Sequence, residues 1–211
     1  PALHAADNIM TFKLAVKTIA KRHGMHATFM PKPKSGVSGS GMHINMSLRK
    51  DGRNIFADET DRFGLSQDAY YFIGGLMKHV YSMTAITNPL VNSYKRLVSG
   101  FEAPLHITWS VTNRSPLIRI PSSFGSGTRI ELRSPDSAAN PYLTIALCLA
   151  AGLDGIKNKI TPPENIQKNI FHMTEEEKEQ LHIKSLPTNL YDAVCAMEKD
   201  AFIREILGEH I

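Results

Sequence analysis

Three charged residues alternate along one short segment. Arg129, Glu131 and Arg133 are separated by Ile130 and Leu132, so a strand over residues 128–133 would place the three charges on one face. A carboxylate between two guanidinium groups can be a solvated cluster of ion pairs. It can also be a site in which the carboxylate binds a metal ion and the arginines bind phosphate or carboxylate oxygens. The residues alone leave both interpretations open.

A second polar face is expected on residues 42–48, where apolar and polar residues alternate strictly. A strand there presents His43, Asn45 and Ser47 on one side. Imidazole is a common ligand of divalent metal ions, and amide and hydroxyl groups can bind a nucleotide. The alternative is a half-buried strand whose polar side faces water.

More arginines, namely Arg96, Arg114 and Arg119, precede the strand expected over residues 128–133. Arg119 stands among the apolar residues of segment 117–120. Because an unpaired buried charge is costly, we expect Arg119 to be paired or to bind a ligand.

Two loops have compositions that suit ligand contact. Residues 32–41 contain three glycines, Gly39 among them, and three serines, so the backbone can approach an anion or carboxylate closely. Glu102 lies in residues 99–104, which glycine and proline punctuate and which suit a mobile lid. The alternatives are a flexible connector and an ordinary surface acid.

Together these residues suit chemistry on several negative charges with a metal ion, as in phosphoryl transfer to a carboxylate. Simple hydrolysis would not need so many arginines. The basic residues are scattered and not interleaved with stacking aromatics, so nucleic acid is a weak candidate partner.

The elements that must position these residues are both helices and strands. Periodicity and capping signals predict helices from Asp7 to about residue 23, over residues 66–86, from Asn140-Pro141 onward, after Thr174 and from Thr188 onward. The run of residues 143–151 is apolar on all sides and is expected to be buried. Strands are expected over residues 42–48, 106–111, 117–120 and 128–133, with a hairpin turn at Asp51-Gly52. This pattern predicts an α+β fold, a largely antiparallel sheet backed by helices.

Composition limits the class of protein. The 211 residues carry 24 Lys and Arg against 20 Asp and Glu, and 42% are hydrophobic, which fits one well-cored domain. No apolar run reaches the roughly 20 residues of a transmembrane helix, so we expect no membrane span. The two cysteines, Cys148 and Cys195, show no pairing pattern, which favours a cytoplasmic location.

Several motifs, in one order, resemble the catalytic domain of type I glutamine synthetase, the bacterial and archaeal form, over nearly the whole chain. The matching segments are residues 5–8, 11–13, 27–33, 39–43, 92–98, 102–104, 113–115, 119–121, 129–133, 135–136 and 138–143. The resemblance implies the fold of that catalytic domain, with residues 1–211 as part of one such domain.

The resemblance also implies roles for individual residues. His43 and Glu131 correspond to ligands of a Mg²⁺ or Mn²⁺ ion that polarises the γ-phosphate of ATP. Asn45, Ser47 and Arg129 correspond to residues that contact ATP.

On the substrate side, the resemblance assigns the remaining residues to glutamate and to the transferred phosphoryl group. Gly39, Arg96 and Arg133 correspond to residues that bind glutamate, and Arg114 and Arg119 to catalytic arginines that neutralise the phosphoryl group. Glu102 corresponds to the lid glutamate that closes over γ-glutamyl phosphate and helps to deprotonate ammonium.

The activity so implied is ATP-dependent ligation of glutamate and ammonia by a ring-shaped homo-oligomer. The family's other metal-binding carboxylates and its small N-terminal domain would lie before Pro1, so these residues are expected to be an excerpt with little activity alone. Alternatives are a γ-glutamyl ligase for a larger amine or polyamine, a non-catalytic structural relative, and a polyanion-binding protein.

Overall fold

A four-stranded sheet lies at the centre of the structure, a computed structural model that describes residues 1–98, 103–111, 113 and 115–208. The strand order is β1 (Ile44–Met46), β6 (Ile130–Leu132), β5 (Ile118–Arg119) and β4 (Trp109–Ser110). The pairs β1–β6 and β6–β5 are antiparallel, whereas β5–β4 is parallel. The sheet is therefore largely antiparallel, as predicted, and the strands are shorter than the alternating segments suggested.

A separate hairpin follows β1. It pairs β2 (Arg49–Lys50) with β3 (Arg53–Asn54). Asp51 and Gly52 form the two-residue turn with φ values of 50° and 79°. These positive values are those of the tight turn that an Asp-Gly pair favours, so the sequence signal is confirmed.

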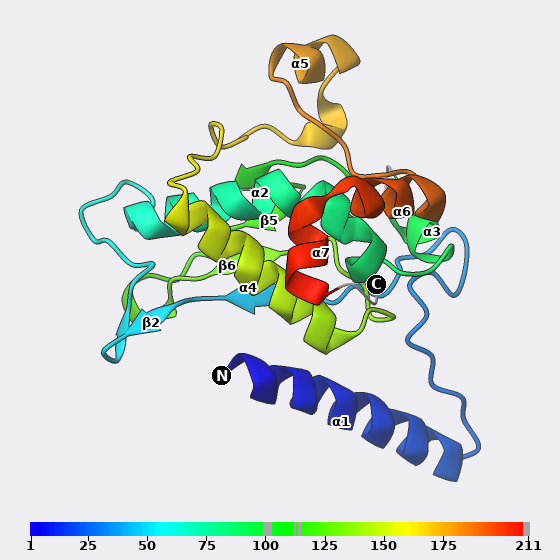
Figure 1. The fold of residues 1–211 in the computed structure, drawn as a ribbon. Coiled ribbons are helices and arrows are strands. Elements are labelled where there is room, and N and C mark those ends of the chain that lie inside the picture. The colour runs from blue at the N-terminus through cyan, green and yellow to red at the C-terminus, as the bar shows by residue number, and fades with distance from the viewer. Residues whose placement is uncertain (99–102, 112, 114, 209–211) are drawn as a thin grey trace.

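Two long helices, α2 (Gln67–Thr87) and α4 (Pro141–Lys157), cover one face of the sheet (Figure 1). They approach closely because glycines face each other. A Cβ added at Gly75 would lie 2.1 Å from the carbonyl oxygen of Ala151, and one at Gly155 would lie 2.0 Å from that of Tyr71. Ser66 and Asn140 cap the two helices through their side chains, and both helices begin within one residue of the start that the sequence predicts.

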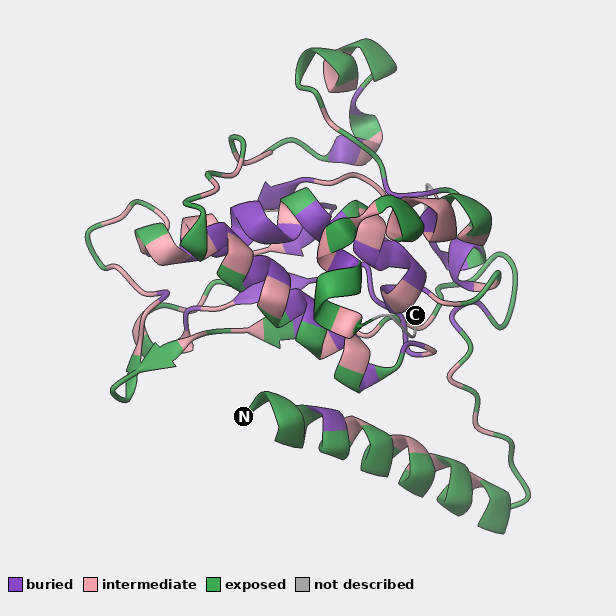
Figure 2. Ribbon diagram, viewed as in Figure 1, coloured by how far each residue is buried: buried purple, intermediate pink, exposed green. Residues whose placement is uncertain are grey.

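The core forms between these helices and the sheet, where the buried residues concentrate (Figure 2). The strands contribute Ile118, Ile130 and Leu132, and all three are fully buried. The opposite face of β6 and its neighbours carries the charged residues. The alternation over residues 128–133 therefore separates core from site as expected.

The C-terminal part adds α6 (Leu190–Lys199) and α7 (Ala201–Leu207), which pack on α2 and α4 respectively. Shorter helices are α3 (Ser93–Arg96), α5 (Glu175–Gln180), η1 (Gly125–Gly127) and η2 (Ile170–His172). The capping box predicted at Thr174 and Glu177 is present at the start of α5.

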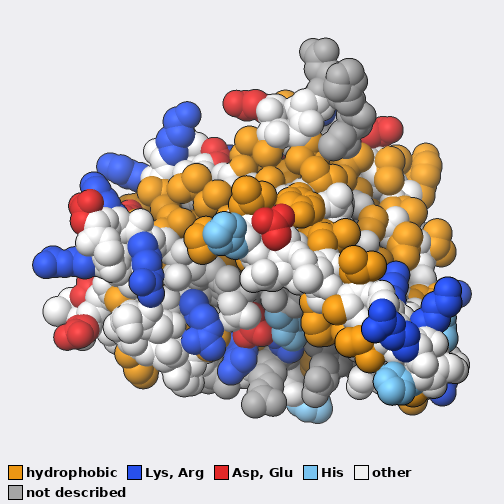
Figure 3. Space-filling model, turned by 90° about the horizontal axis from the view of Figure 1, so that it is seen from below, with side chains coloured by type: hydrophobic (Ala, Val, Ile, Leu, Met, Phe, Trp, Pro, Cys, Tyr) orange, Lys and Arg blue, Asp and Glu red, His pale blue; other side chains and the backbone are white. Residues whose placement is uncertain are grey.

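The first helix, α1 (Ala2–Arg22), lies below α4 in Figure 1 and contacts it. Only Ala6 is buried in it. Seen from below, hydrophobic side chains gather on this side of the molecule (Figure 3). The exposed apolar residues of α1 are Leu3, Met10, Phe12, Leu14 and Ile19.

Two predictions about helices were wrong. α1 begins at Ala2, with Pro1 at its N-cap, and not at Asp7. The Asp7 carboxylate instead accepts a hydrogen bond of 2.7 Å from the Tyr142 hydroxyl. The run of residues 143–151 is not buried on all sides, because Leu149 is exposed and lines a cavity between α1 and α4.

In the part of the chain that the structure describes, no helix combines the length and hydropathy needed to cross a membrane.

Candidate active site

Glu131 is the centre of the charged face. It lies in β6, between Asn45 of β1 and Arg119 of β5 in the sheet register. Glu131 as a whole residue is only 6% exposed. Oε1 lies 2.9 Å from His43 Nδ1, and Oε2 accepts a hydrogen bond of 3.0 Å from Arg119 Nη1. Since Glu131 and Arg133 are both buried, these two residues are not part of a solvated cluster, whereas Arg129 is partly exposed.

Arg119 is thus paired, which the sequence led us to expect for a charge in an apolar strand. Arg133 also faces the carboxylate, with its Nε 4.0 Å from Glu131 Oε1, and is itself buried. Three nitrogen groups around one buried carboxylate offset the cost of removing it from water.

His43 directly precedes β1 and lies at the edge of this cluster. Burial, followed by the positive charge of Arg133, lowers the pKa of its imidazole, and Glu131 only partly opposes that shift. A lowered pKa favours the neutral ring at pH 7, and this is the form that binds metal ions.

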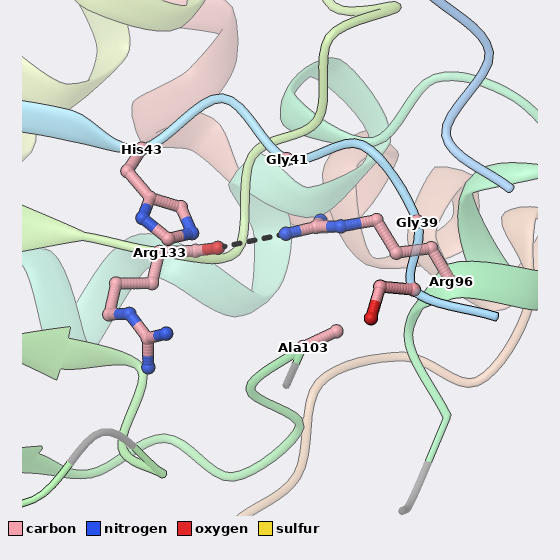
Figure 4. A pocket seen from close by; sticks show the side chains of 7 residues that line it. Gly39, Gly41, His43, Arg96, Ala103 and Arg133 are labelled. Atoms are coloured by element: carbon pink, nitrogen blue, oxygen red, sulfur yellow. Dashed lines mark hydrogen bonds between the residues drawn. The ribbon is translucent and has the colours of Figure 1, made fainter. Parts of the chain in front are cut away.

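A cavity of about 390 Å³ opens beside the cluster (Figure 4). Its lining residues come from the glycine-rich loop, the residue before β1, the helical turn α3, the loop before β4 and the end of β6, and they are Ser38, Gly39, Gly41, His43, Arg96, Ala103 and Arg133. The two guanidinium groups give it a positive lining that suits a carboxylate ligand.

Arg96 is buried at the wall of this cavity. Its Nη1 donates to the carbonyl oxygen of Ser134 at 2.7 Å and its Nη2 to that of Arg133 at 3.2 Å. Burial lowers the pKa of the guanidinium to about 10, and Asp136 opposes that shift. Arg96 therefore stays charged at neutral pH.

The glycine-rich loop, residues 32–41, packs closely against its neighbours at two glycines, Gly39 and Gly41. A Cβ at Gly39 would lie 2.3 Å from the carbonyl oxygen of Pro31, and a Cβ at Gly41 would lie 2.5 Å from Arg96 Nη2. Glycine is thus required at position 39 by close approach to the Pro31 backbone and at position 41 by close approach to the arginine, so the loop is more than a flexible connector.

A second cavity, of about 520 Å³, lies between α1, β1 and α4. Asn45 and Ser47 line it, and His43 lines both cavities. Arg129 Nε donates a hydrogen bond of 3.0 Å to Asn45 Oδ1. The sequence-predicted residues of the nucleotide side therefore lie along β1, adjacent to the charged cluster.

The described residues of this site supply too few ligands to hold a metal ion by themselves. Among the described residues there is no group of three or more His, Cys, Asp or Glu side chains that could hold one. His43 and Glu131 supply two donors of suitable chemistry, whereas Mg²⁺ takes six. These two residues fit a metal site only if the substrate, water or further protein residues supply the other ligands.

The structure brings together most of the residues singled out in the sequence. Six of them, Gly39, His43, Arg96, Arg119, Glu131 and Arg133, surround the first cavity and its cluster, and Asn45, Ser47 and Arg129 form the adjoining group. Glu102 and Arg114 lie outside the described residues. Asn88 and Asp136 were not singled out as site residues in the sequence. Both are buried and bonded to each other, and Asn88 shares the Ser134 carbonyl oxygen with Arg96.

Comparison with known proteins identifies the family. The family model described as the glutamine synthetase catalytic domain matches residues 1–211. The chain is 59% identical over 210 residues to a glutamine synthetase of Clostridium saccharobutylicum and 58% identical over 209 residues to one of Methanosarcina mazei. All of the chain is covered in the first case and 99% in the second, against 47% of each relative. The chain thus spans about half the length of the curated relatives it matches.

Solved structures agree. A structure of GmaS without ligand has a TM-score of 0.87 and 43% identity, and covers 99% of this chain and 47% of its own. A complex of GmaS with ADP has a TM-score of 0.88, also at 43% identity. On this evidence the chain belongs to the glutamine synthetase catalytic-domain family.

Proposed function

We propose that this chain is the catalytic-domain part of an enzyme that ligates glutamate and ammonia to glutamine at the expense of ATP. The observation that carries the proposal is the contact of Glu131 with His43 and Arg119, beside a cavity that Arg96 and Arg133 line. The identity of 56–59% to curated glutamine synthetases supports it.

The chemistry divides into two steps. An oxygen of the glutamate γ-carboxylate attacks the γ-phosphorus of ATP, the bond from that phosphorus to the bridging oxygen of ADP breaks, and γ-glutamyl phosphate forms. Ammonium then loses a proton to give ammonia, which attacks the acyl carbon; the bond from that carbon to the phosphate oxygen breaks, phosphate leaves, and the nitrogen loses a second proton as the amide forms. Because a carboxylate is a poor electrophile, the first step makes the second possible.

In this proposal, Arg96 and Arg133 hold the glutamate carboxylates, and the backbone at Gly39 borders the substrate. Arg119, together with Arg114, neutralises charge on the transferred phosphoryl group. Glu102 closes the site against water and accepts a proton from ammonium.

Asn45, Ser47 and Arg129 bind ATP on the side of the second cavity. His43 and Glu131 would hold one Mg²⁺ or Mn²⁺, with ligands from elsewhere, and the bound ion would supply positive charge to the γ-phosphate. We propose that the whole protein is a cytoplasmic, ring-shaped homo-oligomer and that residues 1–211 alone have little activity.

The second candidate is a γ-glutamyl ligase that uses a larger amine. The similarity to GmaS, at 43% identity, is the reason for considering this candidate. The identity to glutamine synthetases is higher, at 59%, and favours the first candidate. A non-catalytic role is disfavoured because a structural protein has no need of Arg96, Glu131 and Arg133 buried around a polar cavity.

An amine panel separates the candidates. The full-length protein would be assayed with ATP, glutamate and Mn²⁺ against ammonia, a primary alkylamine and a polyamine, with the γ-glutamyl product measured directly. We expect ammonia to give the highest kcat/KM. Turnover with the polyamine but not with ammonia would replace the first candidate by the second.

A further inference from the structure

The side-chain amide of Asn88 bonds to the same segment, residues 134–136, that holds Arg96 of the proposed glutamate site. Asn88 follows the last residue of α2 and is fully buried. Its Nδ2 donates to the carbonyl oxygen of Ser134 at 2.9 Å and to Asp136 Oδ2 at 3.1 Å. Its Oδ1 accepts a hydrogen bond of 2.9 Å from the Thr87 hydroxyl. Both amide hydrogens and the amide oxygen are thus used, which fixes the orientation of the side chain.

The same carbonyl oxygen of Ser134 receives Arg96 Nη1 at 2.7 Å. Asn88 and Arg96 therefore donate hydrogen bonds to the same acceptor, the carbonyl oxygen of Ser134. The backbone adds a further tie, because the amide of Asp136 donates to the carbonyl oxygen of Thr87 at 3.1 Å. The end of α2 is in this way joined to the segment of residues 134–136 by both side chain and backbone.

Arg96 depends on that segment for its position. Among the described residues, no carboxylate oxygen forms an ion pair with its guanidinium within 4.0 Å, and its two hydrogen bonds go to the carbonyl oxygens of Arg133 and Ser134. Burial lowers its pKa, and the nearby charge of Asp136 raises it. The direction in which the guanidinium faces the cavity is thus set by two peptide carbonyls.

We propose that Asn88 is a positioning residue for glutamate, which acts by holding the Ser134 carbonyl and the Asp136 carboxylate in the places that orient Arg96. This inference rests on the proposed function, in which Arg96 binds a glutamate carboxylate. Asn88 is fully buried and is not among the residues that line the cavity.

The test compares three variants of the full-length protein. Asn88→Ala removes the amide, and Thr87→Val removes only the hydroxyl that orients it. Thr84→Val is the matched control, because its hydroxyl is equally buried on α2 and its hydrogen bond of 2.9 Å goes to Val80, away from Arg96. We expect Asn88→Ala to raise the KM for glutamate about tenfold, the value of one lost hydrogen bond, and the KM for ATP less than about twofold. Thr87→Val should show a smaller rise in the same direction, and Thr84→Val none.

A double-mutant cycle separates positioning from general destabilisation. In an Arg96→Lys background, Asn88→Ala should add little to the KM for glutamate, because the group that it positions is gone. An equal rise in both backgrounds, or parallel rises for glutamate and ATP, would mean a merely structural role and would overturn the inference.

A crystal structure of the Asn88→Ala protein gives a reading that does not depend on activity. We expect the hydrogen bond from Arg96 to the Ser134 carbonyl to be lost or displaced. An unmoved guanidinium would refute the positioning role even in an active enzyme. A wild-type protein that binds no glutamate would refute the proposed function, and the crystal structure would still decide whether Asn88 positions Arg96.

Discussion

Nδ1 of His43 lies 2.9 Å from Oε1 of Glu131, although 88 residues separate them in the sequence. The contact arises because β1 and β6 pair antiparallel with Asn45 opposite Glu131. His43 also lines both cavities, so this contact marks the place where the proposed glutamate side and nucleotide side meet.

Replacing Glu131 should abolish most of the activity. Glu131→Gln keeps the shape of the side chain but removes the charge that faces His43 and Arg119. We expect kcat for glutamine formation by the full-length protein to fall about 100-fold or more, which is typical of a lost electrostatic group in an active site. The exposed residue Glu59 gives a control, Glu59→Gln, that should retain full activity. Comparable activity in both variants would remove Glu131 from the mechanism.

A single methyl group at Gly41 should disturb glutamate binding. The new Cβ of Gly41→Ala would lie 2.5 Å from Arg96 Nη2, so the guanidinium must shift. We expect the KM for glutamate to rise by about tenfold or more, since a misplaced guanidinium loses at least one charged hydrogen bond. Steady-state kinetics with Ser40→Ala, which adds no atom to the same loop, provide the comparison. An unchanged KM in Gly41→Ala would argue against Arg96 as the glutamate-binding arginine.

His106 should make stability depend on pH. Burial, and then the charge of Lys178, lower the pKa of its imidazole, while Glu175 partly opposes them. Between the lowered native pKa and the usual value of about 6.5, the unfolded state binds a proton that the native state does not, so stability falls as pH falls through that window.

His106→Gln should therefore reduce the drop in thermal unfolding midpoint of the full-length protein between about pH 7.5 and 5.5. His172→Gln, at an exposed position, should leave the drop as in the wild type. Identical pH dependences of the wild-type and His106→Gln proteins would contradict the assignment.

The contact between α2 and α4 should not tolerate a larger residue. A Cβ in Gly155→Ala would lie 2.0 Å from the carbonyl oxygen of Tyr71, which is backbone and cannot rotate away. We expect a loss of about 1–3 kcal/mol in the free energy of unfolding, the usual cost of overpacking. Chemical unfolding would measure it beside Lys157→Ala, an exposed change on the same helix. A stable Gly155→Ala protein would show that the two helices can separate at little cost.

Local patterns in the sequence predicted those features that depend on neighbouring residues. The helix start at Asn140, the capping box at Thr174, the turn at Asp51-Gly52, and the alternation that separates Ile130 and Leu132 from Glu131 all have local causes. The polar faces of residues 42–48 and 128–133 were predicted for the same reason, whereas the roles of the site residues were implied only by the resemblance to a known family.

Features that depend on tertiary contacts escaped prediction. The parallel pairing of β4 with β5 has no mark in either segment. Asp7 was assigned to a helix start because its type is common there, yet it bonds to Tyr142, which is 135 residues away. Asn88 was not singled out in the sequence, because its contact with the Ser134 carbonyl, which Arg96 shares, needs the fold that brings residues 134–136 beside it.

In the proposed reaction, phosphoryl transfer to the glutamate γ-carboxylate precedes attack by ammonia. The most direct measurement supplies the full-length protein with ATP, ammonia and glutamate labelled with oxygen-18 in the γ-carboxylate, and analyses the released phosphate by mass spectrometry. We expect one labelled oxygen in the phosphate for each glutamine formed, because that oxygen leaves the acyl phosphate when ammonia displaces it. Unlabelled phosphate would refute this order of steps, since it would mean that water and not glutamate had accepted the phosphoryl group.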